Sequence, residues 1–116
     1  MQRRHRLSRS RDFDAVYRHG RSVSTRYLVL YWFARDDEPE AVARIGLAVP
    51  KSVGPAVTRS KMKRRLRELF RARLPELPQD QDYVLVARPG LAEAVDARGF
   101  EWLGERLDEI LGKAAA

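Results

Sequence analysis

The sequence contains no cysteine and only two histidines, His5 and His19. Without cysteine there can be no disulfide and no thiolate metal site. Two histidines this far apart in the sequence are too few for a histidine-built zinc site. These counts do not exclude a metal ion bound through oxygen ligands, so any metal-binding residues are unknown at this stage.

Long apolar runs are also absent. No stretch approaches the roughly 18 apolar residues that a membrane-spanning helix needs. The first six residues, MQRRHR, are basic and lack the apolar core of a secretion signal. We therefore expect a cytoplasmic protein with no membrane partner.

Acidic residues are outnumbered, with 16 Asp and Glu against 23 Lys and Arg, which gives a net charge of +7 over 116 residues. The length suits one domain. A hydrophobic content of 44% with 34% charged residues indicates a folded core under a charged surface. The sequence pI of about 10.4 is typical of proteins that bind nucleic acids.

Residues 56–73, AVTRSKMKRRLRELFRAR, have the clearest periodicity in the chain. The spacing of three and four places one set of apolar residues on a single helical face: Met62, Leu66, Leu69 and Phe70. Pro75 and Pro78 follow, and proline cannot continue a helical hydrogen-bond ladder. This pattern predicts a helix that ends near Arg73 or Leu74.

The same helix carries many cations and a single acid, Glu68. Arg59, Lys63 and Arg67 are four apart and therefore share one face. Like charges at this spacing destabilise a helix, so an anionic partner is the interpretation we favour over a merely solvated face. Nucleic acid comes first, because the arginine fork matches phosphate geometry.

An earlier helix is predicted from Ser8 or Ser10 to Arg18, with Gly20 as its stop. Phe13, Val16 and Tyr17 share its apolar face. Such aromatic residues suit either a protein core or a platform for stacking bases. The pattern leaves both interpretations open.

Residues 23–34 are rich in β-branched and aromatic side chains and predict one long strand covered on both faces. Alternation would place Tyr27, Val29, Tyr31 and Phe33 on one face and Leu28, Leu30 and Trp32 on the other. Residues 36–40 predict a turn and residues 41–49 a second strand, so that the two strands would form an antiparallel hairpin. Residues 83–88 predict a third strand.

The carboxyl-terminal part is acidic. A helical turn is predicted at 91–95 and an amphipathic helix at 100–111. The polar side of this helix carries Glu101, Glu105, Asp108 and Glu109. Because basic residues dominate the first two thirds of the chain, only one side of the molecule is expected to face an anion.

Residues 44–71, RIGLAVPKSVGPAVTRSKMKRRLRELFR, resemble the signature region of the protein subunit of bacterial ribonuclease P. That family has an Arg-x-Gly strand, a Ser-Lys-Lys-x-Gly-Asn-Ala-Val turn, and a helix that opens Arg-Asn-Arg and continues with Lys-Arg and Arg-Glu pairs. The matching positions are Arg44, Gly46, Lys51, Gly54, Ala56, Val57, Arg59, Lys63, Arg64, Arg67 and Glu68. The early SRSRDFDAVYRHGR and the later DYVLVARPG extend the resemblance over most of the chain.

The sequence departs from the family pattern around this turn and helix start. Pro50 stands in place of Ser, and Ser52 in place of Lys. Pro55 and Ser60 each replace Asn, while Lys61 replaces Arg. The effect of these departures on RNA contacts does not follow from the sequence.

The resemblance implies an α+β fold: a single-domain αβββαβα sandwich with a mixed sheet covered by helices, similar to a domain of a ribosomal protein. The basic helix would lie in a left-handed βαβ crossover, and a short fourth strand would lie near Val23. The resemblance thus implies one RNA-binding domain over residues 1–116. A flexible basic arm is expected at 1–7 and a flexible tail at 112–116.

The implied function is that of an accessory subunit of an endoribonuclease. Such a subunit binds the catalytic RNA and the 5′ leader of precursor tRNA and assists removal of the leader. The RNA would carry out the hydrolysis with Mg²⁺, so the protein alone is not expected to be active. No organic cofactor and no obligate protein partner are implied.

The resemblance also assigns binding residues, and none of them is catalytic. The residues expected to face the catalytic RNA are Lys51, Arg59, Ser60, Lys61, Lys63, Arg64 and Arg67. Phe13, Tyr17 and Tyr31 are expected to line a cleft for the leader. Tyr31 then needs an open face, which conflicts with a strand covered on both sides.

Two other functions are compatible with the composition. A ribosomal or RNA-chaperone protein would bind RNA without affecting cleavage. A self-sufficient nuclease would need a carboxylate cluster or a histidine acid and base. The available carboxylates are Asp36, Asp37, Glu38, Asp80 and Asp82. They fall in a predicted turn and a predicted loop, which makes the nuclease the weakest of the three hypotheses.

Overall fold

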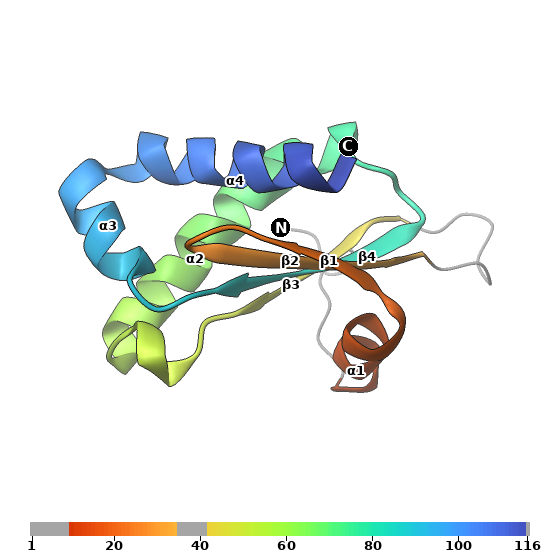
Figure 1. Ribbon diagram of the computed structural model, residues 1–116, viewed down its shortest axis with the longest axis horizontal. Helices are drawn as coiled ribbons and strands as arrows, with labels where there is room; N and C mark the ends of the chain where they lie inside the picture. Colours follow the sequence, from red (N-terminus) through yellow and green to blue (C-terminus); the bar gives the residue numbers. More distant parts are fainter. Residues whose placement is uncertain (1–9, 35–41, 116) are drawn as a thin grey trace.

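The computed structural model of the chain describes residues 10–34 and 42–115. The predicted arm at 1–7 and the predicted turn at 36–40 lie outside these residues. The described chain forms a mixed four-stranded sheet with helices on both faces (Figure 1). Helices α2 (Ala56–Arg73) and α4 (Phe100–Ala115) cover one face, and α1 (Ser10–His19) covers part of the other. This is the α+β architecture that the resemblance implies.

The sheet has the strand order β1-β2-β4-β3. Its strands are β1 (Arg21–Ser24), β2 (Leu28–Ala34), β3 (Arg44–Ala48) and β4 (Gln81–Ala87). β1 pairs with β2, and β2 with β4, in antiparallel fashion. β3 pairs with β4 in parallel and is connected to it through α2, which gives the βαβ crossover implied by the resemblance. The left hand of that crossover stays a prediction.

The single strand predicted at 23–34 is wrong, because the structure divides this stretch into β1 and β2. The Thr25 N–H donates to the Leu28 carbonyl at 2.8 Å and closes the turn between them. Thr25 and Tyr27 stand between the two strands, and both residue types are common in strands, so composition did not mark this boundary. β1 contains Val23 and is the short fourth strand that the resemblance implies.

The division also corrects the predicted faces. Tyr27 lies in the turn, and its ring meets Trp102 of α4 edge-on at 5.1 Å rather than joining the Tyr31 face. Within β2, Leu28 and Leu30 are buried under α4, whereas Val29 and Tyr31 are only half-buried. The strand is therefore covered by α4 at Leu28 and Leu30 and only half-buried from Tyr31 to Phe33.

The predicted hairpin between 23–34 and 41–49 is also wrong. β3 lies at the far edge of the sheet, and β4 separates it from β2. Residues Asp82 to Leu85 of β4 are all buried, which suits a central strand with neighbours on both sides. Sequence order favours pairing between successive strands, and here the crossover overrides that tendency.

The helices agree more closely with the sequence. α2 spans the predicted residues, and Leu74–Glu76 continue it as a short 3₁₀ turn that contains Pro75. α3 (Leu91–Arg98) is longer than the predicted turn and is separated from α4 by Gly99, whose φ of 88° suits glycine. α4 continues to Ala115, so residues 112–115 are helical. In the described residues, no helix has the length and apolar content needed to cross a bilayer.

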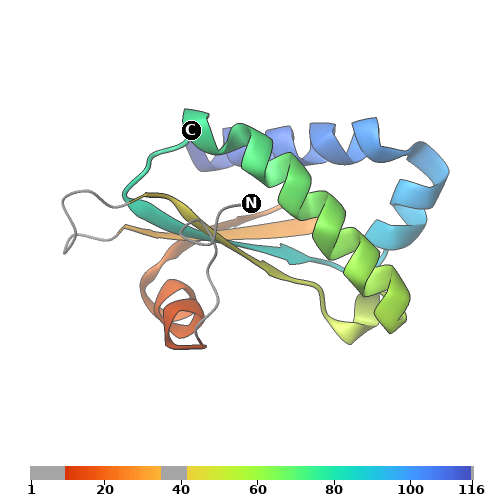
Figure 2. The ribbon, with the colours of Figure 1, turned by 180° about the vertical axis from the view of Figure 1, so that it is seen from behind.

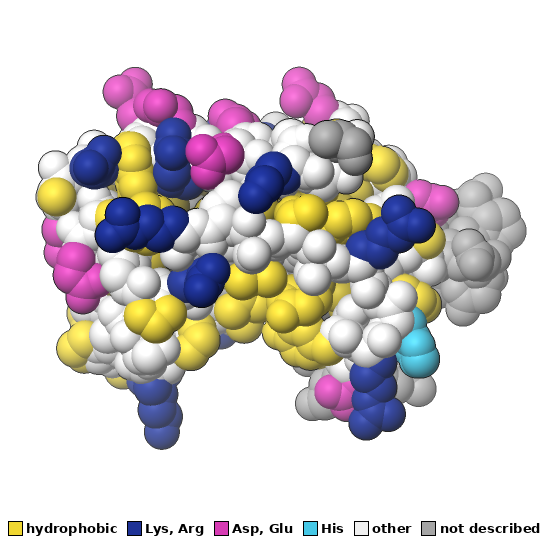
Figure 3. All heavy atoms as spheres, in the orientation of Figure 1, with side chains coloured by type: hydrophobic (Ala, Val, Ile, Leu, Met, Phe, Trp, Pro, Cys, Tyr) yellow, Lys and Arg dark blue, Asp and Glu magenta, His cyan; other side chains and the backbone are white. Residues whose placement is uncertain are grey.

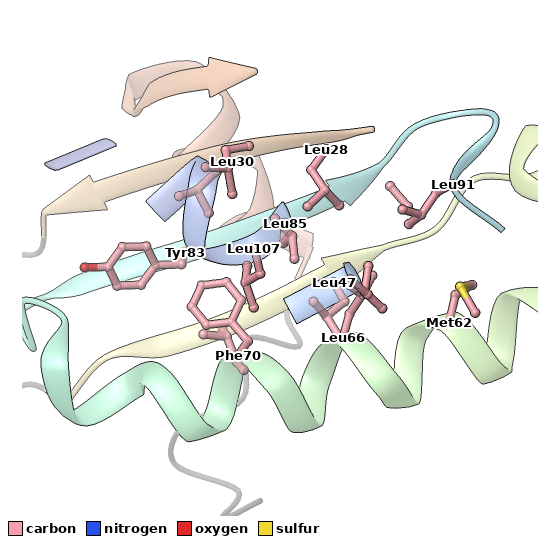
Figure 4. Close-up of a cluster of buried hydrophobic side chains, with 14 of the residues drawn as sticks. Leu28, Leu30, Leu47, Met62, Leu66, Phe70, Tyr83, Leu85, Leu91 and Leu107 are labelled. Carbon is pink, nitrogen blue, oxygen red and sulfur yellow. The ribbon is translucent and has the colours of Figure 1, made fainter. Parts of the chain in front are cut away.

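The main core lies between the sheet and the layer formed by α2 and α4 (Figure 4). From α2, Leu66 and Phe70 point toward the sheet, where Leu85 and Leu107 join them, and Met62 lies farther along the helix below Leu91 (Figure 4). A smaller cluster lies on the opposite face, centred on buried residues of α1 and β4. The basic helix is thus fixed on the sheet by its apolar face, which leaves its other faces outward.

Gly20 connects α1 to β1, and we expect Gly20→Ala to destabilise the fold by about 3 kcal/mol. A Cβ at this position would overlap the backbone carbonyl oxygens of Val16 and Trp32. Because both contacts are backbone, no side-chain rotation relieves them. The loss is measured as the change in the free energy of unfolding in urea.

Gly112 provides the control, since a Cβ there meets nothing within 4 Å and the residue lies inside α4. Gly112→Ala should stabilise the protein by up to about 1 kcal/mol through helix propensity. Equal effects of the two substitutions would contradict the close approach at Gly20.

Candidate nucleic-acid interface

The outward faces of α2 present most of the residues predicted to face RNA. Ser60, Lys61, Lys63 and Arg64 are exposed. They project away from the buried row that packs on the sheet. In the view of Figure 2, α2 runs obliquely across the front of the molecule. A continuous cationic surface on a rigid helix can therefore meet a large polyanion.

Two other cations of α2 are used within the fold. Arg65 stacks its guanidinium 4.1 Å from the centre of the Phe100 ring. Arg73 donates from Nε and Nη2 to the Asp108 carboxylate at 2.5 and 3.1 Å. These hydrogen bonds lower the pKa of Asp108 and raise the pKa of Arg73. Both arginines connect α2 to α4 rather than point to a ligand.

The segment before α2 places further cations at its amino-terminal end. Lys51 is exposed in the 3₁₀ turn Lys51–Val53. Arg59 is half-buried and donates from Nε to the Gly54 carbonyl at 3.2 Å, so it also holds this turn against the helix. Arg67, in the following turns, is half-buried as well. Arg59 and Arg67 are thus less exposed than Lys61, Lys63 and Arg64, whereas Lys51 is exposed like those three.

The two prolines that depart from the family pattern fit the backbone. Pro50 has φ −65° and Pro55 has φ −60°, both values that the proline ring favours. Pro55 occupies the N-cap of α2, and its carbonyl accepts from the Arg59 N–H at 2.9 Å. Neither position needs a side chain to start the helix.

Phe13, Tyr17 and Tyr31 come together on the open face of the sheet, as the resemblance implies. The Tyr17 and Tyr31 rings meet edge-on with centroids 4.9 Å apart, and the Phe13 ring lies 6.4 Å from Tyr17. Tyr17 is 41% exposed, and partial burial together with Tyr31 raises its pKa. Figure 3 shows the surface hollowed between α1 and the turn before α2, with hydrophobic side chains lining the hollow.

Helix α1 is held at this face by an ion-pair network that the sequence did not reveal. Arg44 of β3 donates from Nε and Nη2 to the Asp82 carboxylate of β4 at 2.8 and 2.7 Å. Asp82 is 3% exposed, and Arg44 Nη1 lies 3.6 Å from Asp12 of α1. Local pattern did not mark this network, because Asp82 falls just before the predicted strand at 83–88 and the pairing of β3 with β4 was not predicted.

Carboxylates that could serve metal chemistry are dispersed. Among residues 10–34 and 42–115, no group of three His, Cys, Asp or Glu side chains could hold a metal ion. Asp82, one candidate for a nuclease site, is bound by Arg44 instead. Asp36, Asp37 and Glu38 lie outside the described residues.

Comparison with known proteins gives a consistent result. A family model described as "Ribonuclease P" matches residues 1–115. The ribonuclease P protein component of Acidothermus cellulolyticus is 41% identical over 111 residues, covering 95% of this chain and 88% of that protein. The corresponding protein of Bacillus pumilus is 32% identical over 115 residues, covering 99% of this chain and 92% of that protein.

Solved structures agree with these sequence relatives. The RNase P protein of Staphylococcus aureus superimposes with a TM-score of 0.82 at 27% identity and covers 95% of this chain and 94% of its own. The RNase P protein of Thermotoga maritima gives a TM-score of 0.81 at 30% identity, with 93% of this chain and 96% of its own covered. The similarity therefore extends through sequence and fold over nearly the whole chain.

Proposed function

The chain belongs to the ribonuclease P protein family, and from that premise we propose that it binds the catalytic RNA of ribonuclease P and the 5′ leader of precursor tRNA in the cytoplasm. In this role it assists endonucleolytic removal of the leader, and the RNA carries out the hydrolysis. The observation that carries the proposal is the outward face of α2. In the described residues, no carboxylate lies within ion-pair distance of Lys61, Lys63 or Arg64.

The lysine and arginine side chains of α2 would supply positive charge that a folded RNA lacks. Phosphates that approach one another repel, and each bound lysine or arginine displaces a condensed counterion. The protein thus takes over part of the screening that Mg²⁺ would otherwise provide. Mg²⁺ itself would be held mainly by the RNA.

The aromatic residues of the open sheet face would bind the leader. Unpaired bases stack on aromatic rings with about 1–3 kcal/mol per base and little sequence preference. Phe13, Tyr17 and Tyr31 are close enough to act together, and Tyr17 is the most exposed of the three. Such a surface suits leaders whose sequences differ between tRNAs.

We expect Tyr17→Ala to weaken binding of precursor tRNA by about 1–3 kcal/mol, because one stacking ring is lost. Affinity for mature tRNA, which has no leader, should not change. Both affinities are measured with the assembled ribonucleoprotein. Tyr17→Phe keeps the ring and should bind like the unaltered protein, and an equal loss for both tRNAs would remove Tyr17 from the leader site.

The proposed function is tested by cleavage of precursor tRNA by a bacterial ribonuclease P RNA at low Mg²⁺, with and without the protein. Strong stimulation is expected, since protein cations replace missing screening. Tight binding to the RNA without stimulation would instead favour the ribosomal or RNA-chaperone alternative. Cleavage by the protein alone would contradict an RNA-based reaction.

A further inference from the structure

A second group of cations lies across the molecule from α2. Figure 3 shows Lys and Arg side chains over α4 and the β1–β2 hairpin, with Asp and Glu side chains along the outer edge of α4, on the side opposite to that seen in Figure 2. We call the following residues the basic band: Arg26, Arg88, Arg98, Arg106 and Lys113. All are exposed except Arg106, which is half-buried.

Two members of the basic band are fixed by backbone carbonyls of the hairpin. Arg88 donates from Nη1 to the Thr25 carbonyl at 2.9 Å. Lys113 donates from Nζ to the Ser24 carbonyl at 3.0 Å. A carbonyl oxygen orients a cation without neutralising it, so both positive charges stay available to an anion.

The other three members surround two aromatic rings. Arg98 and Arg106 each lie 5.7 Å from the centre of the Trp102 ring. Arg26 lies 5.3 Å from the centre of the Tyr27 ring, which meets Trp102 edge-on at 5.1 Å. Both rings are half-buried, so part of each is open to solvent.

Charge balance argues for an external anion. Within the described residues, Arg106 is the one member of the basic band with a carboxylate at ion-pair distance, Glu109 at 3.1 Å. Cation–π packing explains why Arg26, Arg98 and Arg106 lie at the rings. It does not explain Arg88 and Lys113, which carbonyl oxygens of the same hairpin orient without neutralising their charge.

We propose that the basic band with Tyr27 and Trp102 is a second binding surface for single-stranded RNA. Phosphates would contact the cations, and unpaired bases would stack on the two rings. A duplex keeps its base faces stacked internally and could use only the charges. This site goes beyond the proposed function, which needs α2 and the cluster of Phe13, Tyr17 and Tyr31. With both sites, one protein would hold two RNA segments on opposite sides.

The test uses a Trp32→Phe background, in which Trp102 is the remaining tryptophan of the two in the chain. An oligouridylate of about 15 nucleotides is titrated, and Trp102 fluorescence and affinity are followed against salt. We expect quenching of Trp102. Replacing Arg26, Arg98 and Lys113 with glutamine should abolish the quenching and reduce the slope of log K against log salt by about 2 units.

A matched control removes the same number of charges from α2 by replacing Lys61, Lys63 and Arg64 with glutamine. This variant should keep the quenching of Trp102. The basic-band variant, in turn, should still stimulate cleavage of a precursor with a short leader, which separates this inference from the proposed function. Absent quenching, equal effects of both variants, or quenching by anionic lipid vesicles but not by oligouridylate would overturn the proposal.

Discussion

A protein with Lys61, Lys63 and Arg64 replaced by glutamine is expected to lose up to about a hundredfold in affinity for the catalytic RNA. This assumes that each exposed cation contributes about 1 kcal/mol. The slope of log K against log salt should fall by about 2 to 3 units, because three phosphate contacts disappear. Stimulation of cleavage at low Mg²⁺ should fall together with the affinity for the RNA. Filter binding over a salt titration measures the first two quantities.

Fold stability should be unaffected by this change, since all three side chains are exposed and the buried row of α2 is untouched. Urea unfolding verifies that point. The basic-band variant, with the same change in net charge, measures how much general attraction and the second surface together contribute to binding of the catalytic RNA. If both variants lost the catalytic RNA equally, α2 would no longer be a specific contact surface.

Arg44→Met is expected to destabilise the fold by about 2–3 kcal/mol, less than the loss for a fully buried ion pair because the Arg44 side chain is 25% exposed. The substitution removes both hydrogen bonds that Arg44 donates to the buried Asp82. It also removes the 3.6 Å ion pair with Asp12, which links α1 to the sheet. Phe13 and Tyr17 of α1 should then lose their fixed arrangement with Tyr31 of β2. The free energy of unfolding in urea gives the magnitude.

A second substitution separates charge from packing. In the double variant Arg44→Met, Asp82→Leu, no carboxylate is left buried, and most of the lost stability should return. Arg106→Met removes an ion pair whose side chains are 30% and 45% exposed, and should change stability by no more than about 0.5 kcal/mol. A similarly small effect at Arg44 would mean that the network contributes little to the fold.

The local residue pattern predicted where the helices lie, but it did not predict the strand boundaries or the strand order of the sheet. The limits of α2 follow from its apolar spacing and from Pro75, both of which act within one or two turns. The boundary between β1 and β2 depends on a turn that contains Thr25 and Tyr27, and both residue types are also common in strands. The central place of β4 is set by a crossover that connects segments more than thirty residues apart, and no local window contains that information.

The candidate site divides in the same way. Helical spacing located the cations of α2, but Arg65 and Arg73 contact Phe100 and Asp108, which lie 35 residues further along the chain. Their internal role therefore becomes visible only in three dimensions. The grouping of Phe13 and Tyr17 with Tyr31 came from family resemblance, and the partial exposure of Tyr31 follows from how little of that face α1 covers.

The strand order has a consequence for how the protein can be made. Within residues 10–34 and 42–115, β3 has β4 as its one strand neighbour, and β4 follows the basic helix in the sequence. During synthesis, β1 and β2 can pair early, whereas β3 and α2 have no completed sheet to pack on until residues 81–87 have left the ribosome. The most cationic segment of the chain therefore emerges on the RNA-rich surface of the ribosome before it can be anchored.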